Sequence, residues 1–204
     1  MNEVLYNNLV KHAKSLLYDE KFVDILSKYL LVVPDEFWTA PCSSSGNYHP
    51  CFDNGVGGVI RHAVLCSTMA HQVCTSMFKD EITDRQHDIV IMACILHDSY
   101  KGGEYPGWPT TVIDHGKIAA DKLKHWAEDN LSYGDFVFLF GSPHATSSKL
   151  YTAMSYHMGI WTQEPVSPMD WYMEEQIVGY CDFFSTRKYL DDGEINKILK
   201  NFYV

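Results

Sequence analysis

A histidine–aspartate pair at the end of a strongly apolar run is the part of this sequence best suited to chemistry. His97 and Asp98 follow residues 89–96, which are all apolar, and Lys101 comes three residues after Asp98. Such a run predicts a buried helix. Burial of an adjacent imidazole and carboxylate is costly in free energy unless each is paired or bound to a metal ion. We therefore expect a special site at this helix end.

A second copy of the same dipeptide, His87-Asp88, provides a comparison. It follows the polar segment 83–86, so we expect it near a solvated helix start. Under that interpretation only the buried pair, His97-Asp98, needs a functional explanation.

Other ionisable residues also lie in apolar helical patterns. His62 begins an apolar stretch, and Asp182 lies in the apolar and aromatic run 177–184. Zinc, manganese and iron sites need several His, Asp or Glu side chains on rigid elements. Few buried basic residues are available to pair with these groups. The predicted ligands of a first metal ion are His62, His97, Asp98 and Asp182.

Two further histidines could bind a second metal ion. His115 begins one predicted helix and His157 ends another. A carboxylate can bridge two cations, so Asp98 could serve both ions. His144 is a weaker candidate because it lies in a predicted loop.

Composition limits the class of protein. The chain has 204 residues, 16 of them basic and 26 acidic, which gives a net charge of −10. One domain is expected at this length. The acidic balance excludes an extended interface for long nucleic acid, but a bound metal could attract a small anionic substrate. The six cysteines form no CxxC pair and indicate reduced thiols. No leader and no apolar run of 18 residues is present, so we expect a cytosolic protein without membrane contact.

Hydrophobic periodicity predicts an all-α fold. Residues 35–57 form the longest irregular stretch. A loop this long in a compact domain is usually functional or disordered, and the aromatic residues of this one argue against disorder. The run 135–140 is the one segment that could instead be a strand. The predicted helices cover about 3–18, 20–31, 57–78, 85–98, 114–131, 146–157, 169–188 and 192–201, with Asp84 and Asp114 as candidate caps.

Taken in order, these motifs resemble the HD-domain metal-dependent phosphohydrolase superfamily, whose pattern is His, His-Asp, further His and a final Asp on a helical bundle. The likeness extends from about residue 37 to 188. It is nearest to small phage and bacterial HD hydrolases and more distant to HD-type 3′-to-5′ exoribonucleases. The matching segments are Phe37–Pro50, Gly57–His62, Leu96–Lys101, His115-Gly116, His157–Gly159 and Tyr180–Asp182.

The resemblance implies one HD-domain bundle over residues 1–204. Residues 1–56 would supply N-terminal helices and a long loop near the metal site, 57–188 the metal-binding core, and 189–204 a C-terminal helix. The implied activity is hydrolysis of phosphate esters in nucleotides or short oligonucleotides. The ion would be Mn, Zn, Ni, Co, Mg or Fe, with one site expected and a second one open. The chain could also form homo-oligomers.

In this interpretation Asp98 acts through the metal, which activates water, and Lys101 offsets charge on the phosphate. The candidate substrate-binding residues are Ser43, Ser44, Ser45, Gly46, His49, Arg61, Trp161 and Arg187. Each of these also has an ordinary structural interpretation as a turn, a surface charge or a packed aromatic ring.

The sequence departs from the family pattern at two places. Tyr156 precedes His157 where many two-metal members have His-His, and Ser99-Tyr100 stands between the dyad and Lys101. Two other functions stay open. One is a di-iron oxygenase, which shares this fold and ligand set, and the other is a non-catalytic module that senses a ligand.

Overall fold

The computed structural model describes residues 2–43, 50–104, 111–142, 148–162, 167, 171–187 and 192–203. Within these ranges the chain is helical and contains no strand, which confirms the all-α prediction there. The helices are α1 (Glu3–Leu16), α2 (Glu20–Leu30), α3 (Asp35–Thr39), α4 (Gly58–Ser76), α5 (Asp84–Leu96), α6 (His115–Asn130), α7 (Tyr133–Phe140), α8 (Lys149–Ser155), α9 (Met173–Ser185) and α10 (Asp192–Leu199), with 3₁₀ turns at Cys51–Asp53 and Gly159–Trp161.

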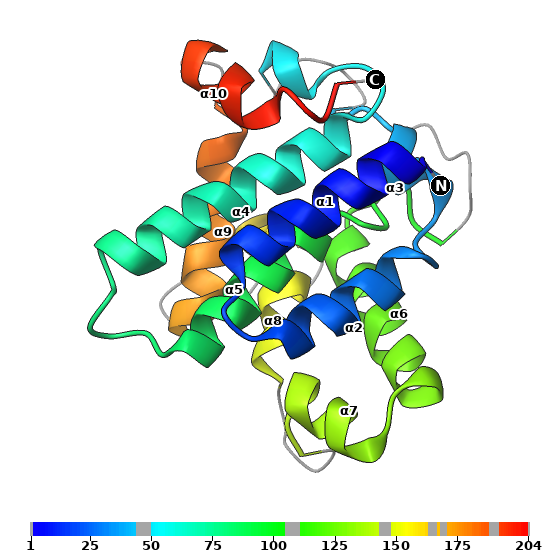
Figure 1. Cartoon of the computed structure of the whole chain (residues 1–204), viewed down its shortest axis with the longest axis vertical. Coiled ribbons are helices and arrows are strands. Elements are labelled where there is room, and N and C mark those ends of the chain that lie inside the picture. The colour runs from blue at the N-terminus through cyan, green and yellow to red at the C-terminus, as the bar shows by residue number, and fades with distance from the viewer. Residues whose placement is uncertain are drawn as a thin grey trace.

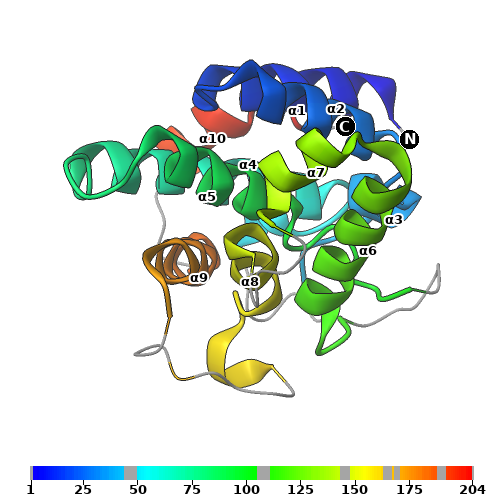
Figure 2. The ribbon, with the colours of Figure 1, turned by 90° about the horizontal axis from the view of Figure 1, so that it is seen from below.

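The helices form three layers around one apolar core (Figures 1 and 2). Helices α1 and α2 make one outer layer, α4 and α5 lie in the middle, and α6, α8 and α9 make the other outer layer. Helix α4 packs against α5 and α9, and α5 packs against both α8 and α9. Residues from distant parts of the sequence therefore meet between these helices.

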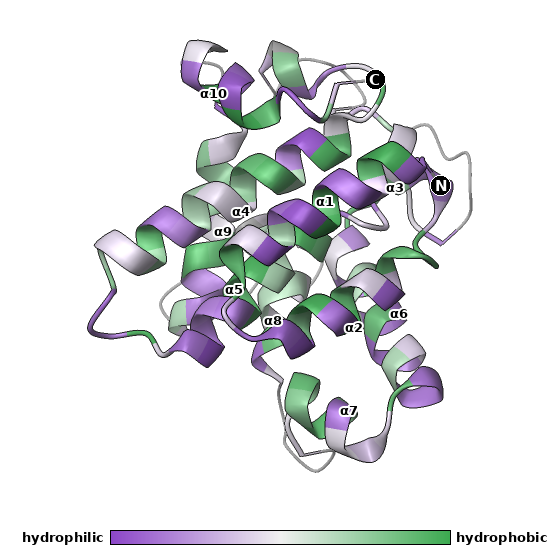
Figure 3. Ribbon diagram, viewed as in Figure 1, coloured by the Kyte–Doolittle hydropathy of each residue, from purple (hydrophilic) through white to green (hydrophobic). Residues whose placement is uncertain are grey.

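Helix α1 shows how the outer layer is formed. Asn2 caps its start by accepting hydrogen bonds from the backbone N–H groups of Val4 and Leu5. The buried residues of α1 recur at intervals of three or four, so one stripe faces the core. The outward face of α1 is mostly hydrophilic, as Figure 3 shows.

Helix α5 is buried on all sides from His87 to Leu96. Thr83 caps its start in a capping box with Gln86, so the predicted cap at Asp84 is wrong by one residue. The helix ends at Leu96, with His97 as its C-cap. The two residues with ligand chemistry therefore leave the end of a rigid, fully packed element.

The comparison dyad is not solvated as predicted. His87 is 2% exposed and Asp88 is 1% exposed. The Asp88 carboxylate accepts hydrogen bonds from the backbone N–H groups of Tyr18 and Asp19 at 3.0 and 2.9 Å, and His87 Nδ1 lies 3.0 Å from it. The connection between α1 and α2 covers this dyad, which the polarity of residues 83–86 could not indicate.

Two segments are more regular than their sequences suggest. The stretch 35–57 contains helix α3 and the 3₁₀ turn Cys51–Asp53. The run 135–140 belongs to helix α7, whose start is capped by Ser132. Phe136, Leu139 and Phe140 of α7 are buried, and no strand partner lies beside this helix in the described residues.

Candidate metal centre

Three buried helices bring the predicted first-metal ligands together. His62 lies in the second turn of α4, His97 and Asp98 follow α5, and Asp182 lies in α9. His62 and His97 are fully buried and Asp98 is 1% exposed, while the Asp182 side chain is 14% exposed. Each side chain is thus held by a packed element, as a preorganised site requires.

The ligand atoms of these residues converge, and we call them the first group. His62 Nε2 lies 3.1 Å from His97 Nε2 and 3.0 Å from Asp182 Oδ1. His97 Nε2 lies 3.4 Å from Asp182 Oδ1, and Asp98 Oδ2 lies 3.7 Å from both imidazoles. Metal–ligand bonds of roughly 2.0–2.2 Å place neighbouring ligand atoms about 3–3.5 Å apart. The distances within the first group, 3.0–3.7 Å, are close to this spacing.

Asp98 Oδ1 and two histidines form a second group. Asp98 Oδ1 lies 2.9 Å from His115 Nε2 and 3.8 Å from His157 Nε2, and the two imidazole nitrogens are 3.1 Å apart. Despite its burial, Asp98 Oδ1 accepts no hydrogen bond from any described residue. The two oxygens of Asp98 therefore face two different groups of nitrogen ligands.

Hydrogen bonds set the tautomers of three histidines. The Nδ1 atoms of His97, His115 and His157 lie 2.9, 2.6 and 2.8 Å from the carbonyl oxygen three residues earlier. A carbonyl oxygen only accepts, so each Nδ1 carries a proton, and each ring in its neutral form directs an Nε2 lone pair at the centre. Lone pairs facing one another at about 3 Å call for a cation between them.

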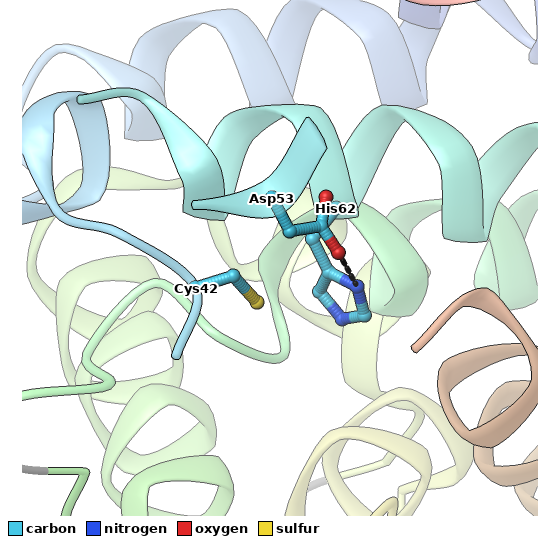
Figure 4. A group of neighbouring side chains, drawn as sticks. All are labelled: Cys42, Asp53 and His62. Atoms are coloured by element: carbon cyan, nitrogen blue, oxygen red, sulfur yellow. Dashed lines mark ion pairs between the residues drawn. The ribbon is translucent and has the colours of Figure 1, made fainter. Parts of the chain in front are cut away.

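His62 is oriented by residues that sequence reasoning missed. Its Nδ1 lies 3.3 Å from Ser185 Oγ and 3.9 Å from Asp53 Oδ2 (Figure 4). Asp53 has no exposed surface, and burial raises its pKa to about 7. A carboxylate behind a metal-binding histidine orients the ring and increases its basicity. The sequence feature that could have identified Asp53 is an acidic residue next to the apolar Phe52 in a loop rich in aromatic residues.

The charges at the centre also suit a divalent cation. Burial opposes ionisation of Asp98, but Lys101 and His97 hold the pKa of its carboxyl well below the usual range. Burial likewise acts against the Asp182 carboxylate, but the adjacent imidazoles of His62 and His97 hold its pKa well below the usual range. Burial lowers the pKa of His157 to about 3, so this ring is neutral at pH 7.

Lys101 lies directly beside the first group. Its ammonium Nζ is 2.5 Å from Asp98 Oδ2 and 3.5 Å from Cys42 Sγ. Burial acts to lower the pKa of Lys101, but the Asp98 carboxylate raises it overall. The predicted catalytic lysine is therefore a fixed positive charge at the edge of the metal centre.

A cavity of about 660 Å³ opens beside both groups. Ser43, Trp161 and Arg187, three of the predicted substrate-binding residues, line it together with Lys101 and Phe183. The Arg187 guanidinium lies 3.9 Å over the Phe183 ring. Trp161 is 65% exposed, which leaves its ring free of the core. Cations and aromatic faces thus surround the approach to the metal centre.

Arg61 does not line this cavity, and its predicted role as a substrate contact is wrong. It is 3% exposed, and its guanidinium donates to backbone carbonyls of Phe52, Asn54, Val56 and Phe202. These bonds tie the loop before α4 and the C-terminal segment to α4. The other candidates, Ser44, Ser45, Gly46, His49 and His144, lie outside the described residues.

Comparison with protein-family models, with curated proteins and with solved structures finds no match. In the described part of the chain, no helix combines the length and apolar character needed to cross a membrane. The buried His, Asp and Cys groups can hold a metal ion, and this conclusion follows from their geometry.

Proposed function

We propose that this chain is a metal-dependent phosphohydrolase of the HD-domain type, acting on phosphate esters of nucleotides or short oligonucleotides. The observation that carries the proposal is the position of Asp98 between two groups of imidazole lone pairs, at the base of a cavity lined by Lys101 and Arg187. Phosphate esters fit such a cavity because their charge matches a cationic centre.

The first group would hold one divalent ion, and the second group would hold another through Asp98 Oδ1. When bound, the ions lower the pKa of a coordinated water and polarise a phosphoryl oxygen. Two carboxylates, Asp98 and Asp182, leave two divalent ions with a net positive charge. An anionic substrate is thereby attracted even though the whole chain carries a charge of −10.

The residues around the cavity suggest how a nucleotide is held. Lys101 offsets charge that builds on the phosphoryl oxygens, and Arg187 at the cavity wall binds a further phosphate or sugar oxygen. Trp161 and Phe183 offer aromatic faces on which a base can stack. His115 would act as a metal ligand through its Nε2 lone pair and not as a proton donor.

The proposal is tested by phosphate or nucleoside release from nucleoside mono-, di- and triphosphates, cyclic nucleotides and short oligonucleotides. Mn²⁺, Co²⁺, Ni²⁺, Zn²⁺, Mg²⁺ and Fe²⁺ are added in turn to chelator-treated protein. We expect turnover that Asp98→Asn abolishes and that the other His-Asp dyad variant, Asp88→Asn, retains. Such a pair separates loss of the metal centre from general loss of fold.

The same preparation distinguishes the two other functions. Two bound irons with oxygen consumption, and no release of phosphate, would favour a di-iron oxygenase. Bound nucleotide without turnover under any metal would favour a ligand-sensing module. Full turnover by Asp98→Asn would overturn the assignment of the site.

A further inference from the structure

A cysteine lies beside the first group, where hydrolytic chemistry does not require one. Cys42 Sγ is 3.9 Å from Asp98 Oδ2 and 3.5 Å from Lys101 Nζ. Its sulfur also belongs to a buried set with Asp53 and His62, whose ligand atoms all lie within 4.8 Å of one another (Figure 4). Cys42 is 1% exposed and lines the same cavity as the metal centre.

We propose that Cys42 Sγ is a further ligand of the ion held by the first group, and that it makes this centre prefer zinc or another thiophilic cation over Mg²⁺ and Mn²⁺. The inference rests on the proposed function only in requiring that the first group bind a metal. It adds a sulfur ligand to a donor set that is otherwise nitrogen and oxygen.

The separation of the donor atoms fits a shared ion. Zinc binds thiolate at about 2.3 Å and carboxylate at about 2.0–2.2 Å, so two such ligands on one tetrahedral ion lie roughly 3.5–3.7 Å apart. The distance from Cys42 Sγ to Asp98 Oδ2 is 3.9 Å, about 0.2 Å beyond this range. Lys101 supplies the second indication, since its ammonium contacts both atoms and occupies a place suited to positive charge.

The backbone fixes the thiol in this position. Cys42 N donates to Asp53 O at 3.0 Å, which ties the start of the loop to its end. Gly58, at the start of α4, leaves the space for this hydrogen bond. A Cβ at this position would lie 2.5 Å from Cys42 N and 2.0 Å from Asp53 O. By contrast, Cys66, Cys94 and Cys181 lie in the apolar core.

Ligation requires the thiolate. When the sulfur–metal bond forms, the S–H bond breaks and the proton leaves to solvent water, with no change in oxidation state. Soft thiolate selects zinc and related ions, whereas magnesium and manganese favour carboxylate, carbonyl and water. The identity of the bound metal therefore depends on this one side chain.

The test uses Co²⁺ as a probe, because cobalt bound to thiolate shows a sulfur-to-metal charge-transfer absorption in the near ultraviolet. Chelator-treated full-length protein is titrated with Co²⁺ as wild type, Cys42→Ser, Cys42→Ala and Cys74→Ser. Cys74 is a buried cysteine of the same helix as His62 and lines a different cavity, so it is the matched control.

We expect the charge-transfer band in wild type and Cys74→Ser and its loss in both Cys42 variants, which still bind Co²⁺ through the remaining ligands. The ratio of Zn²⁺ to Mn²⁺ affinity should fall by about 10-fold or more in Cys42→Ser, at least the effect of removing an outer-shell partner. X-ray absorption of the zinc-loaded wild type should show sulfur at about 2.3 Å.

Two results would overturn the proposal that Cys42 is a metal ligand: wild type that binds Co²⁺ without the charge-transfer band, or a band that persists in Cys42→Ser. Either result would leave the hydrolase proposal intact. If both Cys42 variants fail to fold, X-ray absorption of the zinc-loaded wild type tests the proposal instead. Sulfur bound to zinc would support the ligand, and its absence would overturn it. A wild-type protein that binds no divalent metal would overturn both proposals.

Discussion

Gly116 lies against the imidazole ring of His157: a Cβ built on Gly116 would be 2.6 Å from His157 Nδ1 and 2.5 Å from Met154 O. Helices α6 and α8 pack together here, and the contact brings His115 and His157 to an Nε2–Nε2 distance of 3.1 Å. The glycine is needed for this approach because any side chain would separate the two helices.

Gly116→Ala should therefore disrupt the second group and spare the first. The added methyl pushes the His157 ring and the α8 backbone away, because packed interiors accommodate such overlap only by shifting. In metal titrations by calorimetry or elemental analysis, we expect a wild type with two ions to retain one in the variant. The first group contains no residue of α6 or α8.

Gly134→Ala is the matched control, since only Ser132 Oγ, at 3.9 Å, lies near the added atom. This substitution in helix α7 should keep both ions and add about 0.5–1 kcal/mol of stability from helix propensity. A Gly116→Ala protein with unchanged metal content would show that the second group is not a metal site.

Asp53→Asn should weaken binding of the first ion by about 10–100-fold, the usual cost of removing an outer-shell partner of a histidine ligand. The amide keeps the shape of the carboxyl but removes the charge that faces His62 Nδ1 at 3.9 Å. Competition with a chromogenic chelator measures the affinity. An unchanged affinity would mean that Ser185 alone orients His62.

The metal ligands could be predicted from sequence because an ionisable residue inside an apolar run is a local signal. His97, Asp98 and Asp182 stand out in this way, and the structure brings them together with His62. The spacing of these residues in the sequence does not give the distances between their ligand atoms. Only the packing of the helices shows that the two oxygens of Asp98 face two different groups.

The features that were not predicted depend on contacts between segments and leave no local signal in the sequence. Cys42 and Asp53 lie in an irregular segment where no periodicity marks a buried face, and Gly58 places them by a backbone contact. Burial of His87-Asp88 depends on the α1–α2 connection, which is about seventy residues earlier in sequence. The HD-family identity and the substrate class stay predictions, because neither follows from helical packing.

Asp88→Asn should lower stability without loss of metal. The carboxylate accepts two backbone N–H groups and contacts His87, and the amide can satisfy only part of this set. Broken hydrogen bonds of a buried charged group cost about 1–3 kcal/mol. Urea unfolding measures the loss, and added metal should still stabilise the variant. In Asp98→Asn the added metal should give no such stabilisation.

Lys101→Ala should lower kcat by about 10–1000-fold, the effect of removing one electrostatic stabiliser of a developing charge. Metal affinity should be kept or increased, since the ammonium that lies 2.5 Å from Asp98 Oδ2 competes with a cation. Lys117→Ala, which removes an exposed lysine paired with Asp121, is the control and should leave kcat unchanged. Loss of metal from Lys101→Ala would make the lysine a structural partner only.

His12 links α1 to α4 and should make stability depend on pH. Its Nε2 lies 2.9 Å from Ser67 Oγ, which itself donates to Ala63 O, so the neutral ring acts as donor. Burial, aided by the nearby His71, lowers the pKa of His12 to about 4 from an ordinary 6.5. The unfolded chain then binds the proton more readily than the folded one.

Between pH 6.5 and 4, His12 is protonated in the unfolded chain but neutral in the folded one. The contribution of His12 to stability is therefore fully present above pH 6.5 and is lost as the pH falls through this window. We expect His12→Gln, which keeps a donor but cannot titrate, to lose less stability than wild type between pH 7 and 4.5, by on the order of 2 kcal/mol. Urea unfolding of chelator-treated protein at both pH values gives this difference. Parallel pH dependence in the two proteins would show that His12 is protonated equally in both states, since every other titrating group is common to them.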